Sequence, residues 1–131
     1  MFEITVETIF SAAHAIRLPD GGLEPVHGHD WRVAVAVARS DSGLDGIETV
    51  MDFHVLEAAL IEVIGPWKNN DLNRCEPFVD DAGAMKMNPT AERVAWAIGR
   101  GLMARLPQGV TLLSVAVGEA PGCTAIWRPK T

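Results

Sequence analysis

The chain has 131 residues, of which 48% are apolar and 21% charged, and its formal net charge is −6. That length favours a single domain with a real hydrophobic core. The acidic balance and the scattered Lys and Arg argue against nucleic acid or an anionic membrane as a partner, because both require clustered positive charge.

Two further features concern the compartment. The N-terminal residues MFEITVE lack the basic start and apolar stretch of a signal peptide, and no run approaches the roughly 18 apolar residues of a membrane span. Cys75 and Cys123 are too few for a disulfide framework, and they do not form a C-x-x-C pair. We therefore expect a cytoplasmic protein with reduced thiols.

Alternation of apolar and polar residues predicts a strand in residues 2–16 and a second strand in residues 27–40. In the first strand one parity carries Ile4, Val6, Phe10, Ala12 and His14. In the second strand, His27 and His29 share the parity of Trp31 and of the valines at 33, 35 and 37. A loop rich in Gly and Pro joins the strands, which we expect to pair antiparallel.

Two helices are predicted next. Asp52 is a suitable N-cap for the first, and Leu56, Leu60, Val63 and Ile64 follow at helical spacing. Residues 67–87 show no periodicity, and a loop of this length is usually functional or mobile. The second helix begins at "NPTAER", residues 88–93. Within it Gly99 and Gly101 weaken the helix by about 1 kcal/mol each relative to Ala.

Two more strands close the chain, in residues 110–120 and 123–129, around a Pro-Gly turn. The resulting order is ββααββ. It predicts one α+β domain over residues 1–131, in which an antiparallel four-stranded sheet carries both helices on one face.

His14 lies at the end of the first strand, and His27 and His29 lie at the start of the second. In an antiparallel pair these two ends meet, so the three imidazoles can converge. Three neutral imidazoles with an open fourth position are the ligands of a catalytic zinc site. An isolated H-x-H is common without metal, and it is the third histidine that favours a zinc site here.

Glu119 ends an apolar strand on the parity of Val115 and Val117. It is either solvated beyond the edge of the sheet or the anchor of a pocket. As an anchor, its carboxylate could accept two parallel N–H bonds from a guanidine-like heterocycle edge.

Six motifs occur in the order and approximate spacing of one known family: "FSAAH", "HGHDW", "GIETVMDF", "DLN", "NPTAE" and "VGEAPGC". Together they resemble the 6-pyruvoyl-tetrahydropterin synthase family, which includes the 6-carboxy-tetrahydropterin synthases, and the likeness covers essentially the whole chain. It implies the T-fold, or tunnelling fold. In that fold three ββααββ subunits close their sheets into a barrel, two trimers stack into a homo-hexamer, and sites lie between subunits.

The resemblance also implies roles for particular residues. His14, His27 and His29 match the three ligands of Zn²⁺, and Glu119 matches the carboxylate that grips the ring of a pterin-like substrate. Thr90 and Glu92 match a contribution from the neighbouring subunit, although helix capping alone would explain both.

The chain departs from the family at each position that transfers protons. Leu23 stands in the place of the family's cysteine, and Lys68 and Asn69 replace its Asp-His pair. Glu24 is a possible substitute, since Glu-x-x-His-Gly-His resembles a subgroup in which a glutamate takes over from the cysteine. Glu24 could equally be a solvated loop acid. Lys68 could neutralise developing charge or phosphate.

Three hypotheses about function follow. The first is a zinc-dependent lyase that acts on the side chain of a dihydropterin, with Glu24 as the base. The second is a pterin- or purine-binding protein that kept the pocket and lost the chemistry. The third is a purely structural T-fold hexamer. Loss of a general base typically slows a reaction by about 10²–10⁴-fold, so the usual family reaction is not expected without a replacement.

Overall fold

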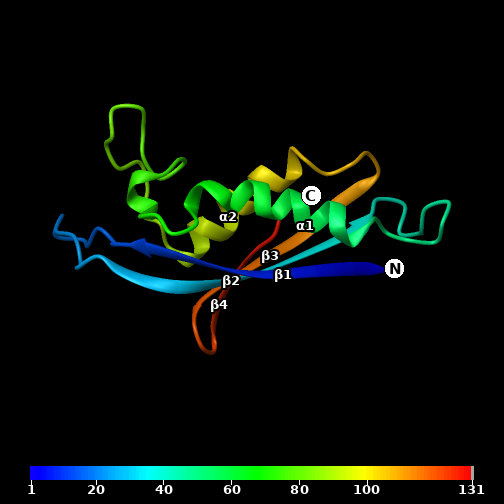
Figure 1. The fold of residues 1–131 in the computed structure, drawn as a ribbon, viewed down its shortest axis with the longest axis horizontal. Coiled ribbons are helices and arrows are strands. Elements are labelled where there is room, and N and C mark those ends of the chain that lie inside the picture. The colour runs from blue at the N-terminus through cyan, green and yellow to red at the C-terminus, as the bar shows by residue number, and fades with distance from the viewer. Residues whose placement is uncertain (131) are drawn as a thin grey trace.

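The computed structural model describes residues 1–130 and contains one four-stranded antiparallel sheet in the order β1-β2-β3-β4. Two α-helices lie together on one face of this sheet (Figure 1). The elements are β1 (Glu3–His14), β2 (His27–Arg39), α1 (Phe53–Ile64), α2 (Ala91–Met103), β3 (Val110–Ala120) and β4 (Cys123–Trp127). The predicted ββααββ order and the α+β architecture are confirmed.

The core lies between the helices and the sheet. From β2, the side chains of Trp31, Val33, Val35 and Val37 face the helices and are at most 2% exposed. Helix α1 covers β1, and α2 covers β3 and β4. The parity that carries these apolar residues also carries the histidines, so the sequence alternation correctly predicts on which face the histidines lie.

Both helices begin at the predicted caps. The Asp52 carboxylate accepts hydrogen bonds from the backbone N–H groups of His54 and Val55, and the Thr90 hydroxyl accepts one from Arg93. Such side chains satisfy N–H groups that have no partner within the helix. None of the helices in residues 1–130 is long and apolar enough to cross a membrane.

The glycines of α2 have a packing reason that the sequence interpretation missed. A Cβ on Gly99 would lie 2.2 Å from Cζ3 of Trp127, and a Cβ on Gly101 would lie 3.0 Å from both methyl groups of Val63. Gly99 therefore lets the Trp127 ring of β4 lie directly on α2. The lower helix propensity of glycine is offset by this contact.

Residues 67–87, which show no periodicity in the sequence, are tied closely to the rest of the fold. The 3₁₀ turn Gly65–Trp67 leads into the segment, the 3₁₀ turn Leu72–Arg74 lies within it, and Leu72 and Phe78 are fully buried. The segment also runs along the free edge of β1. Asn69 N–H donates to the Ser11 carbonyl at 2.7 Å, and Ala13 N–H donates to the Asn70 carbonyl at 2.9 Å. Because the pairing is with backbone, no side-chain periodicity reveals it.

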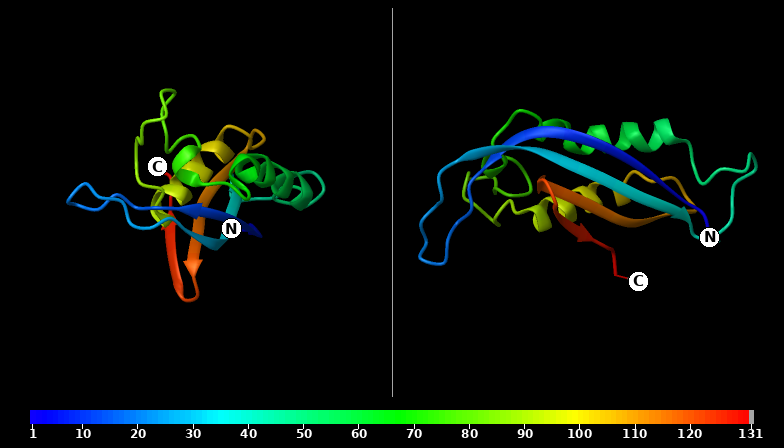
Figure 2. Two further views of the ribbon diagram at one scale, coloured as in Figure 1. Left: turned by 60° about the vertical axis from the view of Figure 1, so that its left-hand side comes forward. Right: turned by 90° about the horizontal axis from the view of Figure 1, so that it is seen from below.

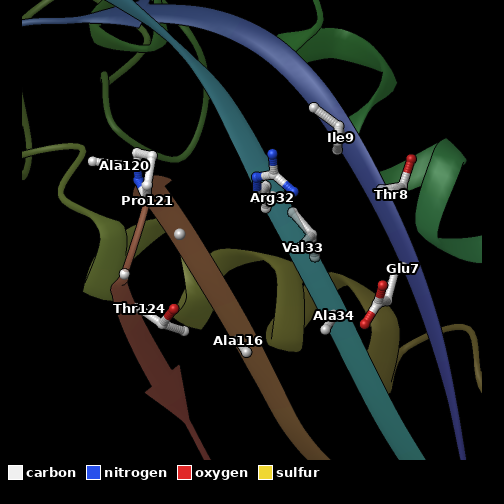
Figure 3. Close-up of a pocket in the computed structure, with 12 residues that line it drawn as sticks. Glu7, Thr8, Ile9, Arg32, Val33, Ala34, Ala116, Ala120, Pro121 and Thr124 are labelled. Atoms are coloured by element: carbon white, nitrogen blue, oxygen red, sulfur yellow. The ribbon is translucent and has the colours of Figure 1, made fainter.

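The opposite face of the sheet carries no helix. A hollow of about 890 Å³ lies there, and Figure 3 looks onto it with the helices behind the strands. Arg32, Ala34 and Glu7 line it from β2 and β1. The histidines share the strand parity of the buried valines, which face the helices. They lie at the end of the sheet from which the connection of β1 and β2, residues 15–26, projects (Figure 2). The hollow is thus separated from the histidines by the sheet.

Candidate functional site

The strand register brings the three predicted histidines together. His14 on β1 is paired directly with His27 on β2, and Ala12 is paired with His29. The three ring centroids lie 4.8–5.0 Å from one another. One potential ligand atom from each histidine lies within 4.8 Å of the other two. The prediction that these imidazoles converge is confirmed.

Backbone carbonyls orient two of the rings. His14 Nδ1 donates to the Pro89 carbonyl at 2.7 Å, and His27 Nδ1 donates to the Pro25 carbonyl at 2.9 Å. A carbonyl can only accept, so in a neutral ring the proton is held on Nδ1 and the lone pair is left on Nε2. An Nδ1–H bond of this kind is what usually accompanies a metal-binding histidine.

His14 is also held neutral by its surroundings. The residue is 2% exposed, and its ring packs against Trp31 with 4.9 Å between centroids. Burial lowers the pKa of His14 below 6.5, and this effect outweighs the Pro89 carbonyl and the Glu119 carboxylate, which raise it. A neutral imidazole is the form that binds metal.

Three buried polar atoms at the site have no hydrogen-bond partner among the described residues: Nε2 of His14, Nε2 of His29 and Oε2 of Glu119. The carboxylate oxygen lies 3.7 Å from Nε2 of His14 and 4.0 Å from Nε2 of His29. Unpaired buried polar atoms are rare and call for an explanation such as an ion. A nitrogen-rich donor set of this kind suits zinc, so the residues present fit a metal centre.

A β-bulge lies at Glu119, beside the histidines. The pairing of β3 with β4 shifts between Gly118 and Ala120, and the pairing of β2 with β3 ends at Arg32 and Gly118. Glu119 therefore belongs to neither ladder. Bulges frequently re-aim a side chain beside a site. The sequence predicted the face on which Glu119 lies but not the bulge.

Glu24 lies at the rim of the histidine cluster. Its Oε1 accepts a hydrogen bond from the Ile16 backbone N–H at 3.0 Å and lies 3.9 Å from Nδ1 of His27. The preceding residue, Leu23, is 55% exposed. Glu24 is therefore a tethered residue beside the histidines, whereas Leu23 presents only an apolar surface.

The remaining candidates, Lys68, Thr90 and Glu92, lie on other elements than the histidines. Lys68 is exposed and follows the first 3₁₀ turn. Thr90 caps α2, and Glu92 is exposed in its first turn. Thr90 and Glu92 closely follow Pro89, whose carbonyl accepts the hydrogen bond from His14.

Neither cysteine belongs to the histidine cluster. Cys75 Sγ donates to the Asp71 carbonyl at 3.3 Å, and Cys123 is exposed on β4. Burial, together with the Asp71 carboxylate, raises the pKa of the Cys75 thiol. It therefore stays protonated near neutral pH and is no substitute for a reactive thiolate.

Asn73 is a supporting residue that the sequence interpretation did not single out. Its amide oxygen accepts from the Ala15 N–H at 2.8 Å, and its amide nitrogen donates to the Ala15 carbonyl at 2.8 Å. These two bonds fix the residue that follows His14. The signal was present in the "DLN" motif, of which Asn73 is the last residue.

Comparison with known proteins identifies the family. The sequence model of the family described as 6-pyruvoyl tetrahydropterin synthase matches residues 3–130. The chain belongs to this family. A 6-carboxy-5,6,7,8-tetrahydropterin synthase from Synechocystis is 34% identical over 131 residues, with 98% of this chain and 92% of the relative covered. A probable 6-carboxy-5,6,7,8-tetrahydropterin synthase from Halobacterium salinarum is 29% identical, with 88% and 79% covered.

Solved structures of 6-pyruvoyl tetrahydropterin synthases share the fold. The Plasmodium vivax protein superposes with a TM-score of 0.77 at 17% identity, covering 99% of this chain and 98% of that one. The Caenorhabditis elegans protein gives a TM-score of 0.71 at 21% identity, with the same coverage. The expected T-fold of a 6-pyruvoyl tetrahydropterin synthase family member is thereby confirmed.

Proposed function

We propose that this protein binds Zn²⁺ through His14, His27 and His29 and acts as a lyase on the side chain of a dihydropterin. One observation carries the proposal: three imidazoles converge, and two of them are oriented by backbone carbonyls that leave Nε2 free. Membership of the family supplies the substrate class, since the two curated relatives are both named as tetrahydropterin synthases.

In this proposal Glu24 replaces the family's cysteine as the general base. The Ile16 N–H holds Oε1 at 3.0 Å, so a carboxylate is fixed beside His27 and can accept a proton from the substrate side chain. Two matched Plasmodium vivax structures carry substitutions at a residue described there as catalytic, a glutamate replaced by alanine or by cysteine. A catalytic glutamate therefore has a precedent in the family.

Other residues bind and position the substrate. When bound, the zinc ion supplies a Lewis acid that polarises a substrate oxygen. Glu119 receives the guanidine-like edge of the pterin ring through paired N–H bonds. The exposed ammonium of Lys68 neutralises charge on a leaving group or phosphate. Trp31, which is fully buried beneath His14 and His29, excludes water from below the site.

We further propose a homo-hexamer of two stacked trimers, in which Thr90 and Glu92 of one subunit complete the pocket of the next. The free outer edge of β4 and the free part of the β1 edge support this, since unpaired edges favour pairing between subunits. Light scattering on the purified protein tests the assembly: a hexamer is expected, and a monomer would contradict it.

Turnover by variants tests the base. The protein is incubated anaerobically with dihydroneopterin and its triphosphate, and products are separated by chromatography. Glu24→Gln is expected to lower the rate by about 10²–10⁴-fold while zinc content stays at the parent level. Glu57→Gln, an exposed change on α1, is the matched control and should leave the rate unchanged. A Glu24→Gln variant as active as the parent would rule out this mechanism.

A second function is favoured by one observation: the position of the family's thiol holds Leu23, whose side chain is 55% exposed. The protein would then bind a pterin or purine without converting it. Calorimetry would show ligand binding that depends on Glu119, and chromatography would show no product. Product formation at a rate that depends on Glu24 would exclude this second function.

A further inference from the structure

We propose that Glu119 is a displaceable fourth ligand of the metal held by the three histidines, so that the resting site is closed by the protein itself. This inference rests on the proposed metal centre. It adds a role for Glu119 in the absence of substrate, beyond the grip on the pterin ring.

The distances from Glu119 to two of the histidines are close to those between the ligands of a zinc ion. With metal–nitrogen bonds of about 2.0–2.1 Å, the ligand atoms of a tetrahedral zinc site lie about 3.4 Å apart. Oε2 of Glu119 lies 3.7 Å from Nε2 of His14 and 4.0 Å from Nε2 of His29. The carboxylate oxygen is thus within about 0.6 Å of tetrahedral spacing from two of the three histidines. It lies outside the group that all three histidines form, so a small adjustment of the Glu119 or His27 side chain would complete the tetrahedron.

The surroundings of the Glu119 Oε2 atom also favour a bound cation. Oε2 is buried and accepts no hydrogen bond from residues 1–130, and the two Nε2 atoms that face it are equally unpaired. Three unpaired polar atoms this close together would each carry an uncompensated desolvation penalty. A cation between them satisfies all three at once, and a carboxylate is a normal zinc ligand.

The local backbone leaves the Glu119 side chain free to move. Glu119 is the bulged residue between Gly118 and Ala120 in the pairing of β3 with β4. No ladder pairing fixes its position, so the side chain can move without disrupting the sheet. It is also 36% exposed, which leaves it within reach of an incoming ligand.

Exchange of Glu119 between the metal and the substrate would control how the substrate enters the site. The guanidine-like edge of a pterin offers two parallel N–H donors, which pair strongly with a carboxylate. When that edge binds Glu119, the carboxylate leaves the histidines and the fourth position opens. Ring recognition would therefore open the metal site only for a ligand with the correct donor edge, and simple anions would be kept out.

The test uses the intact protein loaded with Co²⁺, whose visible absorption reports its ligands, and azide as a small probe of an open position. Azide is expected to leave the spectrum of the parent protein unchanged and to alter that of Glu119→Ala. Glu24→Gln is the matched control, because it removes a second carboxylate beside His27 and should behave as the parent does. Chelator competition should show that Glu119→Ala binds the metal about 10–100-fold more weakly.

Several outcomes would overturn the inference. Azide that enters the coordination of the parent protein as readily as that of Glu119→Ala means that Glu119 is no ligand, and so does unchanged metal affinity in that variant. If Glu119→Ala does not fold, Glu119→Gln takes its place as the variant. The response of the Co²⁺-loaded parent protein to azide tests the inference in either case. A parent protein that takes up no Co²⁺ would refute the three-histidine centre, and with it the proposed function. Uptake combined with azide sensitivity would refute only the fourth ligand.

Discussion

His14 and His27 are paired at one position of the strand register. Their surroundings nevertheless predict different losses of stability when each is replaced by alanine. His14 is buried against Trp31 and donates to the Pro89 carbonyl. Truncating it removes packing and leaves that carbonyl unpaired, which together cost about 3 kcal/mol. Losing the unpaired Nε2 offsets about 1 kcal/mol. The metal-free His14→Ala protein should therefore be less stable than the parent by about 2 kcal/mol.

The His27 side chain is 43% exposed, so His27→Ala should change metal-free stability by no more than about 0.5 kcal/mol. Urea unfolding with a chelator present measures both variants. With zinc at about 100 times its dissociation constant, the parent should gain about 2.7 kcal/mol, and neither variant should gain as much. The reasoning is refuted if the two metal-free variants are equally stable, or if zinc stabilises either one as much as the parent.

Three further predictions concern the scaffold. Gly99→Ala should destabilise the protein by about 1–3 kcal/mol because the new methyl group would overlap Trp127; Gly65→Ala, whose Cβ would meet nothing within 4 Å, is the control in thermal unfolding. Asn73→Ala should cost about 1–3 kcal/mol through its two bonds to Ala15 and weaken metal binding about tenfold, measured by chelator competition. Because burial lowers the pKa of His14 below 6.5, the unfolded chain takes up its proton first, so metal-free stability should fall as pH drops below 6.5. Urea midpoints that show this slope in the parent but not in His14→Ala would confirm its source.

Alternation of apolar and polar residues was enough to predict the first two strands and the face of the sheet on which the site lies. It placed His14, His27 and His29 on the side of the buried valines, and the antiparallel order then brought the strand ends together. The register that pairs His14 with His27 could not be derived in this way, because it depends on the conformation of the connecting loop. Parity is preserved by any shift of two residues.

The contacts that hold the site residues in place could not be predicted from local sequence patterns. The Pro89 carbonyl that orients His14 is 75 residues away in the chain, and a backbone acceptor leaves no side-chain signature. The same holds for the edge pairing of Asn69 and Asn70 with β1. Gly99 was judged by helix propensity alone, whereas its role depends on the Trp127 ring of a strand that follows later in the sequence.

The most direct test of the account is a crystal structure of the zinc-loaded protein soaked with a reduced pterin. The account predicts zinc about 2.0–2.1 Å from Nε2 of His14, His27 and His29, with the donor edge of the ring on the Glu119 carboxylate. A metal bound elsewhere, histidines that bind none, or a pterin that does not touch Glu119 would contradict it.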